Sequence, residues 1–445
     1  MQADFSSIMK PADDPGPGTG NVPGGLRVRE RIMRHTGLLA ALIFTAGCVI
    51  AAPFLEPPFL LSLLVIAFSG ILYLIRGTRA ISISIIVLAL LYGFGWLSPF
   101  IFLATLGIVA AGEIAYRASA GGHHRYLTYM AASTAGAGLV TLYLAWTQHL
   151  GQAEPLLVLL LILLGVLVAV LLKSILQGRT DLLLVESLGV AMTMYLFEDI
   201  HYQVTVATLL VAALIAFSFG YFAYRVRVAD LSGLFSGALV GILIIVFTYV
   251  PYDVRWFLVM LVFLVLGSAS TRYRYDAKAA AGIAESHGGV RGYVNVFANG
   301  LVGVVAAVLF GLSGGSPLSI AMYLGSIATA AADTAGGEIG MTSHDPVLIT
   351  TLEPVPKGTN GGVTLLGEAA SLGAAAIIAF SAFLLGIGDL RMLLFATIAG
   401  FCGANVDSLV GALFENRGFI GNAGTNLVAT LTGGLVAIAL LVLFG

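Results

Sequence analysis

Long apolar stretches recur along almost the whole chain, and they constrain its fold more than any other feature. The stretch at 155–172, PLLVLLLILLGVLVAVLL, contains no charged residue. About 20 mainly apolar residues let a helix span the hydrocarbon core of a membrane. Candidate spans begin near residues 36, 57, 80, 97, 126, 155, 182, 203, 230, 254, 292, 316, 361, 389 and 421. Because strand-like alternation is absent over any useful length, a β-barrel is not expected. The sequence predicts an all-α polytopic membrane helix bundle with about 13–15 transmembrane helices.

Composition supports the membrane assignment. Hydrophobic residues make up 59% of the 445 residues and charged residues 10%, whereas soluble domains carry about 25% charged residues. The net charge is -2 and no basic tract occurs, so membrane lipid is the expected environment and no nucleic-acid partner is expected. Cys48 and Cys402 lie far apart in apolar runs, which excludes a disulfide framework or a zinc site.

Residues 1–30 are polar and rich in Gly, Pro and Asp, as expected of a flexible tail. No A-x-A cleavage site precedes the first apolar span, so this span is expected to be retained as a helix. Four arginines stand immediately before it, at positions 27, 29, 31 and 34. Because basic residues favour the cytoplasmic side, we expect a cytoplasmic N-terminus in an integral protein of the cell membrane.

A weak internal repeat divides the remainder of the chain. The segment AAGEIAYRASAGG (110–122) is followed by RYLTYMAASTAGAG (125–138). In the second half, ADTAGGEIG (332–340) is followed by KGTNGGVT (357–364). Each pair joins an acid at a helix end to a helix start rich in small residues. We therefore predict two weakly related membrane domains, an N-terminal one at 31–227 and a C-terminal one at 228–445.

The clearest candidate site lies between two apolar spans of the second half. Asp333 and Glu338 stand at the end of one span, and Lys357 opens the segment KGTNGG before the next. Ionisable groups at membrane depth are costly, so a functional role is expected. Carboxylates beside a glycine-rich turn with a lysine suit a metal ion and a phosphate, and N–H groups at a helix start receive anions. The predicted phosphate ligands of the turn are Lys357, Thr359, Asn360, Gly361 and Gly362.

A second polar group begins the span near 292. Arg291, Asn295 and Asn299 are spaced by four residues, so on a helix they would share one face. Packing explains such a face poorly, and we expect it to bind phosphate or nucleotide. Lys278 belongs to the basic loop before it, which either binds phosphate or is an ordinary positively charged flank.

The third polar group lies near the C-terminus. Asp407 interrupts an apolar span, and Asn422 and Asn426 are again four residues apart. Together with Asp333 and Glu338, Asp407 provides a third acid for one or two metal ions. Mg²⁺ prefers a few carboxylates plus substrate phosphates to a complete protein cage. The two asparagines are expected to bind nucleotide or phosphate.

Several common nucleotide-binding and hydrolytic motifs are missing from the sequence. It has no G-x-x-x-x-G-K-[ST] loop, no kinase H-R-D and D-F-G pair and no H-E-x-x-H. One G-x-S-x-G match, GLSGG at 311–315, joins two apolar spans, whereas a nucleophile elbow requires a strand before it. We therefore expect a turn there and no serine nucleophile.

Four motifs of the second half resemble a known integral-membrane family. GSASTRYRYDAKAAAGIAESHGGVRGYVNVFANG, AADTAGGEIG, PVPKGTNGGVTLLGEAASLGA and VDSLVGALFENRGFIGNAGTN occur in the order seen in the domain of unknown function 92 family. That family includes plant phytyl-phosphate kinase. The resemblance covers about residues 228–445. It implies transfer of a phosphoryl group from a nucleoside triphosphate, with CTP as one candidate, to an isoprenoid monophosphate such as phytyl or geranylgeranyl phosphate.

The first half resembles the phytol and dolichol kinase family more faintly. ERIMRHTG (30–37) is similar to the basic opening of that family, and GEIAYRASAGG stands where the family has a Gly-Asp motif. Glu113 replaces the aspartate, and ASTAGAG (132–138) lacks the lysine and glutamate of a further motif. We therefore expect a degenerate or structural partner in the first half, with a bifunctional kinase as the lesser alternative.

Taken together, the residues and the resemblance predict a magnesium-dependent membrane phosphotransferase. Asp333, Glu338 and Asp407 are expected to hold Mg²⁺, and with Lys357 they form the expected catalytic group. Phosphoryl transfer needs mainly positioning and charge neutralisation from the protein. The alternatives are a secondary transporter, which also has broken helices and buried acids, and a noncatalytic lipid-binding scaffold. Depth discriminates the first two, because transport sites lie near the midplane and catalytic acids should cluster with Lys357 at one face.

Overall fold

The computed structural model describes residues 44, 46–55, 57–74, 79–119, 124–150, 155–176, 182–198, 205–248 and 253–445. The chain forms two compact units, Met1–Trp96 and Leu97–Gly445. The predicted polar tail and the four arginines lie outside the described residues. The side of the membrane that holds the N-terminus therefore stays a prediction.

In the first unit, a short 3-10 helix η2 (Ala52–Phe54) precedes α2 (Pro58–Tyr73), which packs on α3 (Arg79–Gly93). A Cβ atom at Gly93 would lie 2.7 Å from Ser62 Oγ. The missing side chain therefore lets these two helices approach closely, as small residues do in membrane bundles.

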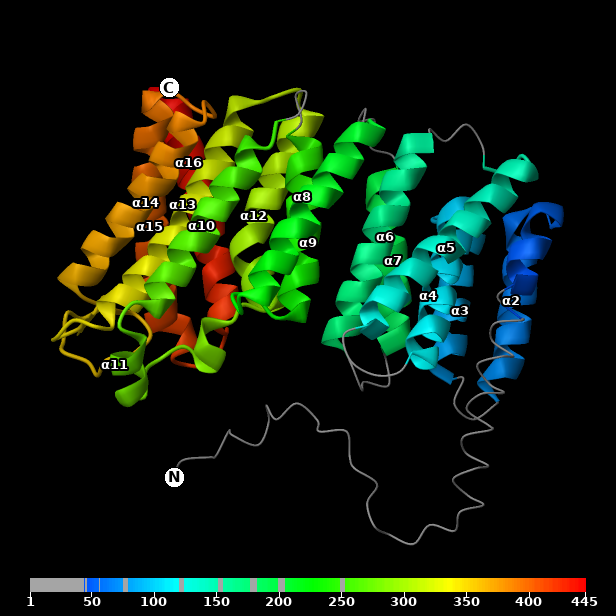
Figure 1. Cartoon of the computed structure of the whole chain (residues 1–445), viewed down its shortest axis with the longest axis horizontal. Helices are drawn as coiled ribbons and strands as arrows, with labels where there is room; N and C mark the ends of the chain where they lie inside the picture. The colour runs from blue at the N-terminus through cyan, green and yellow to red at the C-terminus, as the bar shows by residue number, and fades with distance from the viewer. Residues whose placement is uncertain are drawn as a thin grey trace, which may run out of the picture. The chain divides into compact units, whose positions relative to one another are not determined.

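The second unit contains the remaining helices (Figure 1). Its first helices are α4 (Pro99–Ala118), α5 (His124–Trp146), α6 (Pro155–Ile175), α7 (Leu182–Glu198), α8 (Val206–Arg225) and α9 (Leu231–Phe247). They are followed by α10 (Arg255–Arg272), α11 (Tyr275–Ala280), η3 (Ser286–Gly289), α12 (Tyr293–Leu312) and α13 (Pro317–Gly340). A two-stranded sheet of β1 (Val347–Leu348) and β2 (Gly362–Val363) precedes α14 (Leu365–Leu384), α15 (Leu390–Val410), η4 (Gly411–Glu415) and α16 (Asn422–Phe444).

The chain is a polytopic membrane helix bundle, as its sequence predicts. In the described part of the chain, nine helices are long and apolar enough to cross a membrane. This is fewer than the predicted 13–15 crossings. The helices α2, α3 and α9 are apolar but shorter, and α13 is long but carries polar residues in its C-terminal half. An apolar run in the sequence therefore does not always become a helix of full spanning length.

Helix α13 is the centre of the C-terminal bundle, because it packs against α10, α12, α14, α15 and α16. Small residues make these contacts close: a Cβ atom at Gly325 would lie 2.4 Å from the carbonyl oxygen of Gly433 on α16. On the α10 side, Tyr323 is fully buried and donates a hydrogen bond of 2.6 Å to the carbonyl of Trp256. Close contacts between small residues thus combine with large buried side chains in this bundle.

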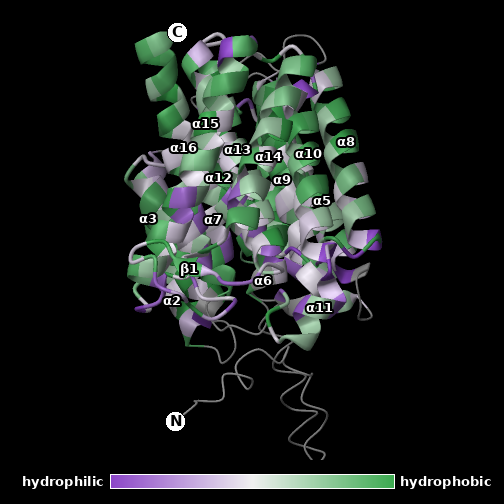
Figure 2. Cartoon of the chain, turned by 90° about the vertical axis from the view of Figure 1, so that its left-hand side faces the viewer, coloured by the Kyte–Doolittle hydropathy of each residue, from purple (hydrophilic) through white to green (hydrophobic). Residues whose placement is uncertain are grey.

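Five helix ends of this bundle lie together. The helices α12, α14 and α16 begin, and α13 and α15 end, at the end of the bundle where α11 lies, opposite the C-terminus (Figure 1). Hydrophilic residues gather near β1 and α11, whereas the opposite part of α14, α15 and α16 is hydrophobic (Figure 2). The sequence fixes the start of α14 through Thr364, whose hydroxyl accepts a hydrogen bond from the N–H of Gly367 at 3.0 Å.

A separate buried ionic cluster joins α4, α5, α6 and α7. Glu113 accepts hydrogen bonds from Lys173 and, at 2.5 Å, from Arg117. Lys173 Nζ also lies 3.8 Å from Glu186 Oε2, and Tyr129 donates to Glu186 Oε1. All of these side chains except Arg117 are buried. Glu113, which stands where the phytol and dolichol kinase family has an aspartate, thus belongs to an ion network inside the bundle.

The helices α4 and α13 are similar at both ends. Each begins at a Ser-Pro pair, 98–99 and 316–317, whose serine hydroxyl caps the helix. Each carries the sequence Gly-Glu-Ile near its end, at 112–114 and 337–339, and each glutamate pairs with a buried lysine from another helix. These features agree with an internal repeat. The domain boundary near 228 stays a prediction.

Candidate functional site

A cavity of about 330 Å³ lies where these five helix ends meet the loop 341–364. Of the residues predicted from the sequence, Lys278 does not line it. The others do, and they come from segments far apart in the chain: Arg291, Asn295, Asn299, Asp333, Glu338, Lys357, Thr359, Asn360, Gly361, Gly362, Asp407, Asn422 and Asn426.

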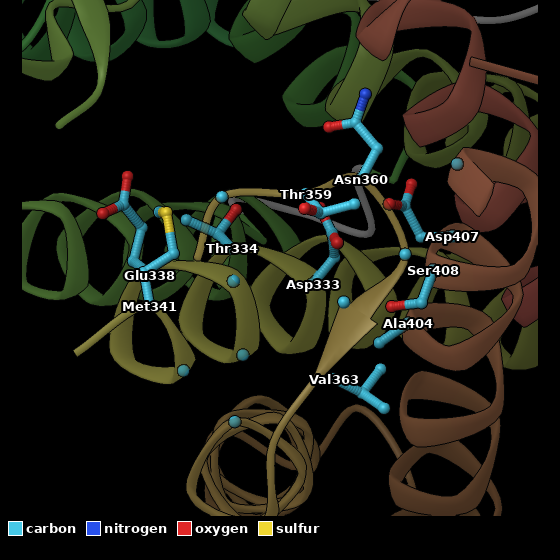
Figure 3. A pocket seen from close by; sticks show the side chains of 18 of the residues that line it. Asp333, Thr334, Glu338, Met341, Thr359, Asn360, Val363, Ala404, Asp407 and Ser408 are labelled. Atoms are coloured by element: carbon cyan, nitrogen blue, oxygen red, sulfur yellow. The ribbon is translucent and has the colours of Figure 1, made fainter. Parts of the chain in front are cut away.

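Two aspartates from different helices form the most acidic part of the cavity. Asp333 lies on α13 and Asp407 on α15, and their carboxyl groups interact directly. Figure 3 shows them with Thr359 and Asn360 beside them. Asp407 Oδ1 is buried and has no hydrogen-bond partner in the described structure. Two carboxylates at such close range repel each other unless a cation or a proton lies with them.

Glu338 lies apart from this pair, further along α13 (Figure 3). Its carboxylate accepts a hydrogen bond from Lys278, whose side chain is 1% exposed. Lys278 also donates to the carbonyl of Thr271 at 2.8 Å, in the last turn of α10. Lys278, which was predicted to bind phosphate, is therefore paired with Glu338 and does not line the cavity.

The aspartate pair fits the predicted magnesium ion. In the regions that the structure describes, no three His, Cys, Asp or Glu side chains are grouped so that they alone could hold a metal. Mg²⁺ needs only one or two carboxylates when substrate phosphates and water complete its octahedron. The pair supplies two carboxylates and an oxygen without a hydrogen-bond partner. The predicted set of Asp333, Glu338 and Asp407 stays a prediction, with Glu338 as its separate member.

Arg291 lines the cavity, but the prediction that it lies on the helix with the two asparagines is wrong. The helix α12 begins at Tyr293, after the extended residue Gly292. The backbone of Arg291 pairs with the segment before α9: its N–H donates to Val228 O at 2.9 Å, and its carbonyl accepts from Asp230 N at 3.1 Å. This long-range pairing fixes Arg291, which is 8% exposed and whose Nη2 has no hydrogen-bond partner among the described residues.

The asparagines connect α12 to α16. Asn299 Nδ2 donates to the carbonyl of Asn295 at 3.0 Å, one turn earlier. Its Oδ1 lies 3.5 Å from Nδ2 of Asn426, which is 8% exposed. Asn426 Oδ1 has no hydrogen-bond partner in the described part of the chain. Asn422 is exposed at the first turn of α16.

The glycine-rich loop is held against α15. A Cβ atom at Gly361, where φ is 79°, would lie 2.6 Å from the carbonyl oxygen of Ser408, so the close contact requires glycine. The prediction that this loop begins a helix is wrong, because β2 and Thr364 separate it from α14. The N–H groups of Thr359 and Gly362 already donate within the loop. Those of Asn360 and Gly361 donate to no described residue, so they are available to an anion.

Three acids in the cavity wall were not predicted from the sequence: Glu285, Glu368 and Glu415. Glu415 acts electrostatically on the aspartate pair and accepts a hydrogen bond from Thr425 at 3.2 Å. Burial raises the pKa of Glu285, which lies in the loop before α12 beside Arg291. A signal for Glu415 existed, because this acid ends the same apolar run that contains Asp407.

Comparisons with known proteins cover the part of the chain that holds this cavity. The chain is 34% identical over 237 residues to the uncharacterized membrane protein MJ0933 of Methanocaldococcus jannaschii, which covers 53% of this chain and 94% of that protein. It is 31% identical to Protein PGR of Arabidopsis thaliana, over 47% of this chain and 78% of that protein. It is also 31% identical to the chloroplastic Protein VTE6 of the same plant, over 46% and 63% of the two chains.

No solved structure matches the chain. The family model described as integral membrane protein DUF92 matches residues 214–434, which include every residue that lines the cavity. Together with the match to nearly the whole archaeal protein, this shows that the chain belongs to the integral membrane protein DUF92 family.

Proposed function

We propose that the cavity transfers a phosphoryl group from a nucleoside triphosphate to an isoprenoid monophosphate and so forms the diphosphate. The main support is a set of three buried side-chain atoms without hydrogen-bond partners in the described structure, all from residues that line this cavity: Arg291 Nη2, Asp407 Oδ1 and Asn426 Oδ1. Buried polar atoms without partners are costly, so three of them in one cavity favour a site that binds a polar ligand. A phosphate that brings its own cation would satisfy both the guanidinium and the carboxylate.

The charge of the cavity wall supports the same ligand. Six carboxylates line it, with two cationic side chains, Arg291 and Lys357. The carboxylates are Glu285, Asp333, Glu338, Glu368, Asp407 and Glu415. Such a wall would repel a free triphosphate, whereas a triphosphate that brings its own divalent cation suits it. When bound, Mg²⁺ would neutralise charge on the donor phosphates, and Asp333 and Asp407 are the residues that would hold it.

The depth of the cavity supports an enzyme over the transporter alternative. Asp333 lies seven residues before the end of α13, and Asp407 lies eight residues before the end of the span Leu390–Glu415, which are about 10 and 12 Å along the helix axes. Lys357 and the loop with free N–H groups lie outside the helices altogether. Transport sites are typically formed near the midplane between broken helices. A site at the helix ends meets a soluble nucleotide and a membrane-bound acceptor at the same time.

The proposed reaction requires no strong general acid or base from the protein. An oxygen of the acceptor monophosphate attacks the γ-phosphorus, the bond from this phosphorus to the β-phosphate oxygen breaks, and the nucleoside diphosphate leaves. The product contains one new phosphorus–oxygen–phosphorus bond, and the acceptor is already ionised. The residues therefore act by holding phosphates in line: Lys357 with the N–H groups of Asn360 and Gly361 on one side and Arg291 on the other.

The isoprenoid class rests on the sequence resemblance to a family that includes plant phytyl-phosphate kinase. The test is transfer from labelled CTP, ATP, GTP and UTP to phytyl or geranylgeranyl monophosphate by detergent-purified protein with Mg²⁺. We expect labelled diphosphate with at least one donor. No product with any donor, together with uptake of a phosphate ester into proteoliposomes, would support the transporter instead.

A further inference from the structure

We infer that Arg291 is the receptor for the phosphate of the membrane-bound acceptor, and that Gly267 on α10 creates the space for its guanidinium group. This inference rests on the proposed function and divides its cavity into two ends. Two cationic side chains of the described residues line the cavity, and they differ in exposure and in location. Lys357 is exposed in a loop, whereas Arg291 is 8% exposed.

The surroundings of Arg291 place its charge inside the bundle. Its Cζ lies 5.9 Å from the centre of the Phe263 ring, and a Cβ atom at Gly267 would lie 2.9 Å from its Nη2. Gly267 stands five residues before the end of the spanning helix α10, which is about 8 Å along the axis. The guanidinium therefore lies at the depth of the helices, against one apolar ring and one bare stretch of backbone.

Arg291 is also held ready for a ligand. Its backbone is paired to the segment before α9, and close approach there requires Gly233, where a Cβ atom would lie 2.2 Å from the carbonyl oxygen of Arg291. The nearby acids Glu285 and Asp333 act on its charge, yet Nη2 has no hydrogen-bond partner among the described residues. The planar guanidinium group of Arg291, with an N–H group that has no partner among the described residues, binds a phosphate oxygen with better geometry than a lysine ammonium group would.

Depth then distinguishes the two phosphates. A nucleoside triphosphate arrives from water and meets the exposed Lys357 loop first. A monophosphate at the end of an apolar chain arrives along the membrane, and its headgroup meets a cation that lies at the depth of the helices. The ligand class assigned to Arg291 is therefore a phosphomonoester that carries a long apolar chain.

The first test is equilibrium binding of radiolabelled geranylgeranyl monophosphate to detergent-purified protein without nucleotide. We expect Arg291→Lys to weaken binding about 10- to 100-fold, the effect of losing one charge-assisted hydrogen bond. Gly267→Ala should weaken it about tenfold, because the added methyl group displaces only the flexible guanidinium. Gly237→Ala on α9 is the matched control, since its Cβ meets nothing within 4 Å. Unchanged binding in both test variants would overturn the inference.

Competitors identify the ligand. Geranylgeraniol should not displace the probe and inorganic phosphate should displace it weakly, because charge and chain are both required. Displacement by phosphatidate as effective as that by geranylgeranyl monophosphate would assign the site to a lipid headgroup and overturn the acceptor role. Displacement by inorganic phosphate alone would overturn the requirement for a chain.

A kinetic test separates this inference from the proposed function. Gly267→Ala should raise the KM for the acceptor about tenfold and leave the KM for the nucleotide unchanged, whereas Lys357→Met should do the reverse. If both variants change only the nucleotide KM, the inference fails while the proposed function stands. If the wild-type protein transfers no phosphate but binds the probe through Arg291, the proposed function fails and the binding site remains.

Discussion

Lys278 and Glu338 offer the sharpest test of the packing around the cavity. The two side chains are 1% and 9% exposed, and Lys278 also donates to two carbonyls in the last turn of α10. The substitution Lys278→Met removes the ammonium group, keeps an unbranched side chain of similar size, and leaves the Glu338 carboxylate buried without its partner. Removing one member of a buried ion pair costs about 3–5 kcal/mol. We expect a loss of this size, because the side chain links α11 to α13 and to the end of α10.

Trp256 reports this unfolding in a background where the other two tryptophans, Trp96 and Trp146, are replaced by phenylalanine. It lies at the other end of α10, and its ring centre is 4.4 Å from that of Tyr323 on α13. Its fluorescence during unfolding by urea in detergent should therefore follow the separation of these two helices. The exposed pair of Arg391 and Asp389 is the control, since its side chains are 63% and 57% exposed and its loss should cost at most about 1 kcal/mol.

A double variant completes the cycle. Lys278→Met with Glu338→Leu removes both charges, and we expect it to recover part of the loss, because an uncompensated buried charge is the main cost. If Lys278→Met lowers the free energy of unfolding no more than Arg391→Met does, the pair is not a buried ionic link. Lys278 would then be available to phosphate, as the sequence analysis predicted.

Three further predictions concern other parts of the chain. Glu415→Gln should lower transfer less than Asp407→Asn does, about tenfold against about 10²–10³-fold, because Glu415 acts on the aspartate pair only electrostatically; equal losses would contradict this. Asp389→Ala should cost about 0.5 kcal/mol near neutral pH. The hydrogen bond from the N–H of Met392 lowers the pKa of Asp389 in the folded protein. The cost of the substitution should therefore vanish as the pH falls from about 3.9, the pKa of a free aspartate, towards the lower pKa of folded Asp389. Urea titrations at several pH values measure this cost. Lys173→Met should destabilise α4–α7 by about 3 kcal/mol and leave the KM of both substrates unchanged in folded protein; a changed KM would give the first half a catalytic role.

The sequence predicted the bundle and most of the cavity wall for one physical reason. Polar residues within apolar spans must face protein or water, so Asp333, Asp407 and Asn426 were expected to face the inside of the bundle. What the sequence could not predict depends on contacts between distant segments. The pairing of Arg291 with the segment before α9 places it off the helix, and the ion pair with Glu338 removes Lys278 from the cavity.

The missed acids have the same explanation. Glu285 and Glu368 look like ordinary flanking residues in the sequence, because nothing local shows that they face a shared cavity. Nine helices of the described residues are long enough to span, fewer than the apolar runs in the sequence, and this has another reason. Hydropathy marks apolar runs, but a short run such as α9 can be buried inside the bundle, where most of its side chains lie.

The most direct test of phosphoryl transfer at this cavity is a comparison of wild-type protein with Asp333→Asn. Both are purified in detergent, checked for equal tryptophan fluorescence, and given labelled nucleoside triphosphate, geranylgeranyl monophosphate and Mg²⁺. We expect labelled diphosphate from the wild type and a loss of about 10²-fold or more in the variant, because Asp333 is one of two carboxylates that would hold the cation. Equal product from both proteins would contradict the assignment of this cavity as the site of transfer.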